Sequence, residues 1–243
     1  MKANPWIMGI LALSACAGCR HRQAASPALK AKAAGTAIVV VSGDKQLGGI
    51  GSPLPQPLVV QVNDAQGNAV TGAEVELSGP HGVVLDPAQV LTDDNGQATI
   101  KITMAGIAGR YELTASSQDA HGKPFTLPVA EYALGYQQEV GSEVNEKYCS
   151  RCHDSESTVE QVSNYDNLAV KPHSFANGDA YNKLSETDLT NIIEHGGPAM
   201  NRSALMPPYE WTLSKAEVQA MVAYIRLVSD PPYVAPGVAY AKH

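Results

Sequence analysis

A short cysteine–histidine motif constrains this chain more than any other sequence feature. Residues Cys149, Ser150, Arg151, Cys152 and His153 form the pattern Cys-x-x-Cys-His, which is the attachment pattern for c-type haem. Two thiols about one helical turn apart can each form a thioether with a haem vinyl group, and the adjacent histidine then lies under the iron as a nitrogen ligand. The motif therefore predicts one covalent haem c, with Cys149 and Cys152 as thioethers and His153 as an axial ligand.

Three other uses of this motif fit less well. A zinc site needs two more Cys or His ligands at suitable spacing. The remaining cysteines, Cys16 and Cys19, have the Cys-x-x-Cys spacing, but they lie where the predicted signal peptide ends and one of them is the expected lipidation site. A thioredoxin-like redox pair belongs in a βαβ setting, whereas the residues around this motif have a helical period. A structural disulfide must meet strict geometry, and it would leave the histidine unexplained.

The start of the chain indicates export. Met1 and Lys2 precede an apolar run that ends at Leu13 and is followed by small residues. The run is too short to span a bilayer as a helix and is typical of a signal peptide, which we assign to residues 1–15. The next residues, 16–35, are rich in alanine and keep no apolar period, as expected of a linker.

The end of this run, Leu13-Ser14-Ala15-Cys16, resembles the lipobox of bacterial lipoproteins. The resemblance implies that Cys16 becomes the lipidated first residue of an exported, membrane-anchored protein. Ala17 resembles the residue that sorts such proteins to the outer membrane of a host with two membranes. Two alternatives stay open, namely lipidation at Cys19 and ordinary cleavage after Ala17.

Residues 36–135 have the pattern of a β-sandwich. Apolar and β-branched residues alternate with polar ones in short runs, which is typical of half-buried strands, and Asp-, Asn- and Gly-rich turns separate them. Several short strands at such spacing predict a sandwich. The expected strands are Ala37–Val41, Leu58–Val62, Glu74–Leu77, Ala98–Thr103, Tyr111–Ala115 and Phe125–Val129.

The same region resembles the bacterial Ig-like domain of invasins and intimins. The resemblance covers about 100 residues, the usual size of such a sandwich, and implies a spacer or binding module without enzymatic activity. It rests on Leu54-Pro55, Asp64 with Gly67-Asn68, Thr92-Asp93 with Gly96, and Ala108-Gly109-Arg110-Tyr111. The turn at Thr92–Gly96 is acidic but lacks the spacing of an EF-hand loop, so turn chemistry explains it without a metal.

Residues 136–230 have a helical period and form the second predicted domain, with residues 231–243 as a tail. The run into the haem motif is the first expected helix. Ser185 with Asp188 predicts the start of the next helix, and Ser214 with Glu217 predicts the start of the last. The chain is thus expected to be multidomain, with an all-β Ig-like sandwich followed by an all-α haem domain. A buried haem would supply much of the core that so short a domain lacks.

The segment around the last helix resembles class I cytochromes c, whose axial methionine precedes a proline ahead of the C-terminal helix. Met206, followed by Pro207, matches that methionine. The resemblance therefore implies His/Met ligation. Met200 is the nearest rival, and His173 or His195 would give a bis-histidine site. The stretch from Asn164 to Asn182 is longer and more polar than in the shortest class I members.

Two further side chains near the predicted site have uncertain roles. Trp211 and Arg202 are possible donors to haem propionates, although plain packing or a solvated charge is the more ordinary role for each.

A haem with both axial positions filled by protein leaves no place for substrate, so we expect an electron carrier rather than an enzyme. No catalytic residue is assigned. The net charge of −7 argues against nucleic acid as a partner, and the expected partners are redox proteins of unknown identity. Two alternatives are a surface adhesion module with a redox-sensing haem, and the haem subunit of a periplasmic redox enzyme. Export implies the periplasmic or cell-surface side of a membrane.

Overall fold

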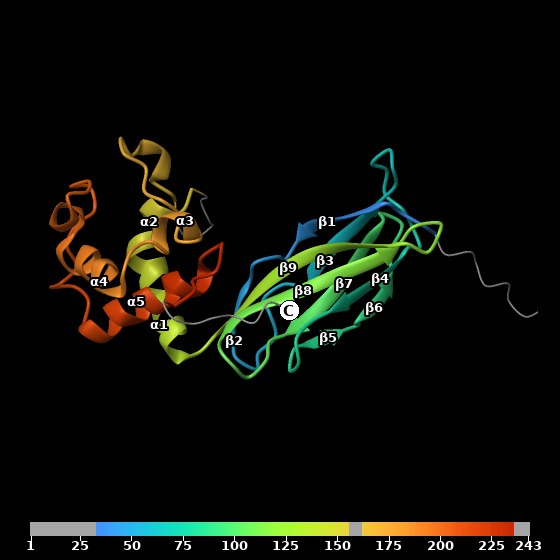
Figure 1. The fold of residues 1–243 in the computed structure, drawn as a ribbon, viewed down its shortest axis with the longest axis horizontal. Coiled ribbons are helices and arrows are strands. Elements are labelled where there is room, and N and C mark those ends of the chain that lie inside the picture. Colours follow the sequence, from blue (N-terminus) through green and yellow to red (C-terminus); the bar gives the residue numbers. More distant parts are fainter. Residues whose placement is uncertain (1–32, 156–161, 236–243) are drawn as a thin grey trace, which may run out of the picture. The chain divides into compact units, whose positions relative to one another are not determined.

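The computed structural model describes residues 33–155 and 162–235, and it divides them into strands followed by helices (Figure 1). The predicted signal peptide and the candidate lipidation sites Cys16 and Cys19 lie outside the described residues. Strands occupy the chain as far as Leu134, and helices begin at Tyr136. Within the described residues, no helix is long and apolar enough to cross a bilayer.

The first half of the described chain forms two β-sheets. One has the strand order β1-β3-β7-β5 and the other the order β2-β9-β8-β4-β6. All neighbours pair antiparallel except β2 and β9, which pair parallel. The strands are β1 (Ala37–Ser42), β2 (Leu47–Gly49), β3 (Leu58–Asn63), β4 (Glu74–Ser78), β5 (Val84–Asp86), β6 (Gln89–Leu91), β7 (Gln97–Thr103), β8 (Gly109–Gln118) and β9 (Pro124–Leu134).

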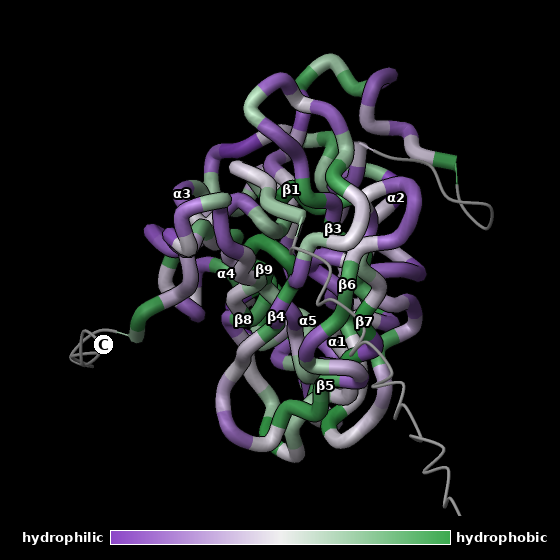
Figure 2. Tube along the Cα trace, turned by 90° about the vertical axis from the view of Figure 1, so that its right-hand side faces the viewer, coloured by the Kyte–Doolittle hydropathy of each residue, from purple (hydrophilic) through white to green (hydrophobic). Residues whose placement is uncertain are grey.

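The sandwich core follows from the alternating pattern. Hydrophobic and hydrophilic residues are interspersed along the strands (Figure 2), and every second side chain of the inner strands is buried. Residues that face the same core pair across strands, for example Val60 with Ala98. All six predicted strands are present. The structure adds β2, β5 and β6, each three residues long, and extends β8 and β9 well beyond the predicted limits.

An aspartate side chain stabilises three of the turns in the same way. In the turn after Asp93, one carboxylate oxygen accepts hydrogen bonds from the backbone N–H groups of Asn95, at 2.8 Å, and Gln97, at 2.9 Å. Gly96 has φ of 72°, a conformation that costs glycine little. The turns that begin at Asp64 and Asp119 repeat this arrangement. These hydrogen bonds account for the acidic turn residues.

The second half consists of short helices. They are α1 (Tyr136–Val144), the π-helix η1 (Asn145–Cys149), α2 (Ser150–His153), the 3₁₀ turn η2 (Tyr165–Asn167), α3 (Gly178–Tyr181), α4 (Glu186–His195), the 3₁₀ turn η3 (Gly197–Met200) and α5 (Lys215–Val228). The predicted caps are confirmed, because Ser185 with Asp188 and Ser214 with Glu217 both form reciprocal capping boxes. The first predicted helix differs, since a π-turn that ends at Cys149 interrupts it.

Helices α1 and α5 pack closely where glycine removes a side chain. A Cβ atom placed on Gly141 would overlap the carbonyl oxygen of Ala220 and lie 2.7 Å from Tyr224 Cβ. The apolar side of α5 is buried and joins Leu189 and Ile193 of α4 in one core. This core forms one wall of the candidate site.

Candidate haem-binding site

The two motif cysteines follow α1 through the π-turn. Cys149 ends η1, and Cys152 lies on α2 one residue before His153. Both are free thiols. Burial, together with the charges of Cys152 and Asp154, raises the pKa of the Cys149 thiol to about 12. The thiol is therefore protonated at neutral pH, unlike the thiolate that a redox-active pair requires.

The imidazole of His153 is held in one tautomer. Its Nδ1 lies 2.8 Å from the carbonyl oxygen of His173. A carbonyl oxygen only accepts hydrogen bonds, so Nδ1 carries the proton and Nε2 keeps a free lone pair. Burial lowers the pKa of His153 and favours this neutral form. The ring of Phe175 stacks on the imidazole, with 4.3 Å between centroids and 13° between planes. Nε2 is therefore the nitrogen available to a metal.

A cavity of about 460 Å³ opens beside Cys149 and His153. A smaller hollow of about 100 Å³ contacts both of these residues and also Cys152. The large cavity is mostly apolar, which suits a flat hydrophobic cofactor. Helices α4 and α5 supply part of its wall through Leu189, Ile192, Ile193, Met221 and Ile225. The donor set of two thiols and a neutral imidazole beside an apolar cavity fits a covalently attached haem.

Of the candidate sixth ligands, Met206 and His173 lie at this cavity, and Met206 alone also lines the smaller hollow. It lines both hollows together with His153, whereas Met200 and His195 line neither. The backbone of Met206 is held in place because its carbonyl oxygen accepts a 3.0 Å hydrogen bond from the N–H of Gly197. The His195 side chain instead lies beside two carboxylates, those of Glu194 and Glu210.

The long polar segment before α4 contributes most of what the sequence did not reveal. It supplies the His173 carbonyl and the Phe175 ring, both against His153, and it ends in α3 with Tyr181. No period or motif in the sequence marks these residues. His173 lines the large cavity, and its backbone carbonyl lies at Nδ1 of His153.

The two possible propionate donors differ in position. Arg202 lines the large cavity. Trp211 is 91% exposed and lines neither hollow. Arg202 is therefore the better placed of the two for a contact with a bound cofactor.

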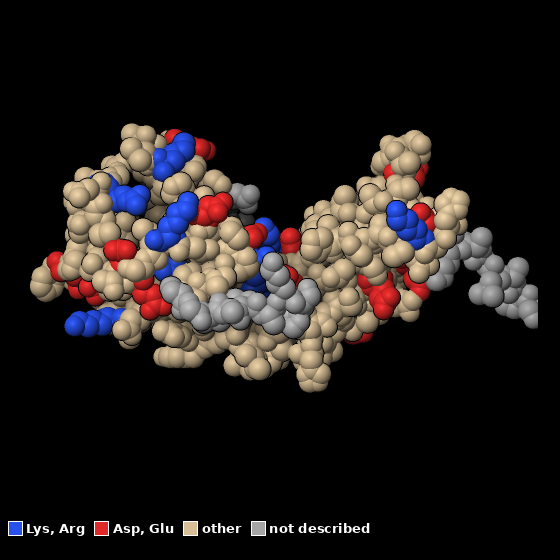
Figure 3. Space-filling view, viewed as in Figure 1, with Lys and Arg blue, Asp and Glu red and all other residues tan. Residues whose placement is uncertain are grey.

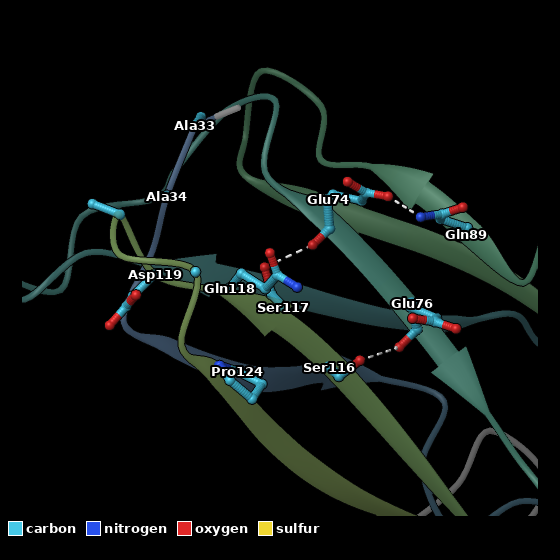
Figure 4. A pocket seen from close by; sticks show the side chains of 12 residues that line it. Ala33, Ala34, Glu74, Glu76, Gln89, Ser116, Ser117, Gln118, Asp119 and Pro124 are labelled. Carbon is cyan, nitrogen blue, oxygen red and sulfur yellow. Dashed lines mark hydrogen bonds between the residues drawn. The ribbon is translucent and has the colours of Figure 1, made fainter. Parts of the chain in front are cut away.

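The sandwich has a polar groove of its own, with a volume of about 550 Å³ (Figure 4). Hydroxyl groups of Ser116 and Ser117 donate to the backbone carbonyls of Glu76 and Glu74, and the Gln89 amide donates to the Glu74 carboxylate. These bonds join neighbouring strands β8, β4 and β6. The polar groups of the groove therefore contribute to the cohesion of the sheet.

Comparison with protein families divides the chain as its secondary structure does. Residues 56–129 match the family described as bacterial Ig-like domain (group 1). Residues 137–225 match the family described as cytochrome C oxidase, cbb3-type, subunit III. The chain carries a bacterial Ig-like domain and a cytochrome c domain. Together the two domains support haem-based electron transfer outside the cytoplasm.

Several solved structures resemble part of this chain. The D00–D0 domain of intimin is 14% identical, with 43% of this chain and 49% of that chain covered and a TM-score of 0.33. The D0–D1 domain of intimin is 20% identical over 42% and 50%, with a TM-score of 0.31. Invasin, a bacterial integrin-binding protein, is 19% identical over 41% and 19%, with a TM-score of 0.30. This chain thus spans at most half of each. No curated protein matches the chain.

Proposed function

We propose that this protein is an exported, lipid-anchored cytochrome that carries one haem c and transfers electrons between redox proteins, with the Ig-like domain as a spacer or docking module. One observation carries the proposal: the two thiols, the imidazole of His153 and the thioether of Met206 all border the same pair of adjoining hollows. When bound, a haem that takes two iron ligands from the protein would exchange single electrons without binding substrate at the iron.

The residues of this chain would have distinct roles in such a site. Cys149 and Cys152 would hold the cofactor covalently. His153 would bind the iron through Nε2, because Nδ1 donates to a backbone carbonyl. Met206 would be the second iron ligand from the chain, and a methionine ligand raises the reduction potential. The apolar wall would exclude water, and the buried haem would complete a small core.

The first experiment is purification of the exported protein with its cofactor. We expect the absorption spectrum of a c-type haem, retention of the haem after denaturation, and a reversible one-electron titration. Haem that denaturation releases would contradict thioether attachment, and haem that cannot be reduced and reoxidised would contradict the carrier function. Replacement of Cys149 by Ser should leave at most one thioether, so it tests the attachment directly.

The lipid anchor rests on the lipobox-like residues before Cys16 and needs its own test. Cells that make the protein are labelled with a radioactive or clickable fatty acid. We expect label in the wild-type protein and in the Cys19→Ser variant, and none in Cys16→Ser. The opposite result for the two variants would move the anchor to Cys19. Absence of label in the wild-type protein would contradict lipidation.

The role of the Ig-like domain can be separated from that of the haem. On the face of the helical domain seen in Figure 3, basic and acidic side chains are interspersed, so that face has no single-sign patch for partner selection.

Pull-down with the anchored form identifies redox partners, and deletion of residues 36–134 then tests the sandwich. Loss of electron transfer supports a docking or spacer role. Full transfer with loss of surface binding favours the adhesion module with a redox-sensing haem.

A further inference from the structure

One carbonyl oxygen near the candidate axial histidine accepts two hydrogen bonds. The oxygen of His173 lies 2.8 Å from Nδ1 of His153 and 2.8 Å from the hydroxyl of Tyr181. The Tyr181 hydroxyl is also 3.3 Å from Nδ1 itself. The tyrosine hydroxyl donates to the carbonyl, and at neutral pH a tyrosine is protonated. Tyr181 and the imidazole of His153 thus share the His173 carbonyl oxygen as hydrogen-bond acceptor.

Two helices hold the tyrosine in this position. Tyr181 ends α3, whose first turn is capped by the Asn177 side chain, which accepts a 3.1 Å bond from the Ala180 N–H. From α5, the guanidinium of Arg226 donates to the backbone carbonyl of Tyr181 at 2.8 Å. The ring packs at 5.4 Å from Phe175, which itself stacks on the imidazole. The backbone of Tyr181 is therefore held by Arg226, and its ring is held by Phe175.

We propose that Tyr181 is a positioning residue that raises the reduction potential of the haem iron through the His173 carbonyl, an inference that rests on the proposed function. A strong hydrogen bond from Nδ1–H makes an axial imidazole more basic, and second-shell bonds of this kind tune a metal. A carbonyl that already accepts from Tyr181 has less electron density for the bond from Nδ1–H. The imidazole then donates less charge to iron, and the reduced state is favoured.

The test is the midpoint potential of the full-length, haem-loaded protein. Tyr181→Phe removes the donor and should lower the potential, with about a threefold change in the equilibrium constant for reduction from a hydrogen bond of ordinary strength. That change is about 30 mV, since tenfold corresponds to about 59 mV for one electron. The control, Tyr165→Phe, removes a hydroxyl from the same segment outside the cavity and should leave the potential unchanged.

A second measurement separates tuning from loosened packing. Incorporation of 3-fluorotyrosine at Tyr181 keeps the ring and makes the hydroxyl a stronger donor, so it should raise the potential. A structural defect that admits water would lower it instead. The Nδ1 proton resonance of His153 in the reduced protein should move in opposite directions in the two variants.

An unchanged potential in Tyr181→Phe, or an equal shift in Tyr165→Phe, would overturn the inference. If Tyr181→Phe fails to take up haem, the fluorotyrosine protein provides the test. If its reduction potential does not rise, the inference is overturned. Failure of the proposed function looks different, because the wild-type protein itself would then lack the spectrum of covalent haem.

Discussion

Glu131 provides a test of the sandwich that does not depend on haem. It lies on β9 at the same parity as the core residues Val129 and Ala133, and it is 0% exposed. One carboxyl oxygen accepts a 2.8 Å hydrogen bond from the backbone N–H of Gln46. Burial raises the pKa of Glu131 to about 8; the Gln46 bond opposes this shift, and the charge of Asp44 adds to it. The carboxyl is therefore neutral in the folded protein at neutral pH.

The sign of the pH dependence follows from proton binding. The ordinary pKa is 4.5, so between about 4.5 and about 8 the folded protein keeps a proton that the unfolded chain releases. Stability then falls as pH rises, by about 1.4 kcal/mol per unit. From about pH 5 to about pH 7 the loss is about 2.5 kcal/mol. This loss depends mainly on the unfolded pKa, so a shift of the folded value within about a unit changes it little.

Replacement of Glu131 by Gln should remove this slope. A glutamine keeps an acceptor for the N–H of Gln46 and has no proton to lose. Urea unfolding of the full chain, followed by circular dichroism in the strand region at several pH values, measures the difference between variant and wild type. The control is Glu76→Gln, which changes an exposed carboxyl on β4 and should keep the wild-type slope. Equal slopes for Glu131→Gln and wild type would refute the reasoning.

Three further predictions concern the helical domain. Gly141→Ala should destabilise the domain by about 2 kcal/mol because the new Cβ overlaps Ala220, whereas the control Glu143→Ala on the same helix should not. Thermal unfolding measures both variants, and equal midpoints would contradict the close packing of α1 against α5. Ser214→Ala should cost about 1 kcal/mol through loss of the capping box of α5, measured by urea unfolding, and no loss would mean that the cap is replaced. Met206→Ala should alter the absorption spectrum of the haem protein and lower its potential, and an unchanged spectrum would move the sixth ligand elsewhere.

Local patterns in the sequence predicted much of the fold. Period-two runs such as Leu58–Val62 define strands because one face of each is buried. Capping boxes define where α4 and α5 begin because the first backbone N–H groups of a helix need acceptors. Strands β2, β5 and β6 could not be predicted because three residues are too few to show a period. The π-turn that ends at Cys149 could not be predicted for a similar reason, since a helical period does not reveal one extra residue.

The candidate site, like the fold, could be predicted from the sequence only in part. The cysteine–histidine motif is visible in sequence because attachment needs neighbouring residues on one turn. The surroundings of His153 are not visible, because the His173 carbonyl and the Tyr181 hydroxyl are 20 and 28 residues away and lack a local pattern. The choice between Met206 and Met200 likewise depends on which one borders the cavity. Sequence alone predicted the attachment motif, whereas the tertiary structure decided which distant groups meet at the histidine. Such contacts arise only when separate segments of the chain pack together.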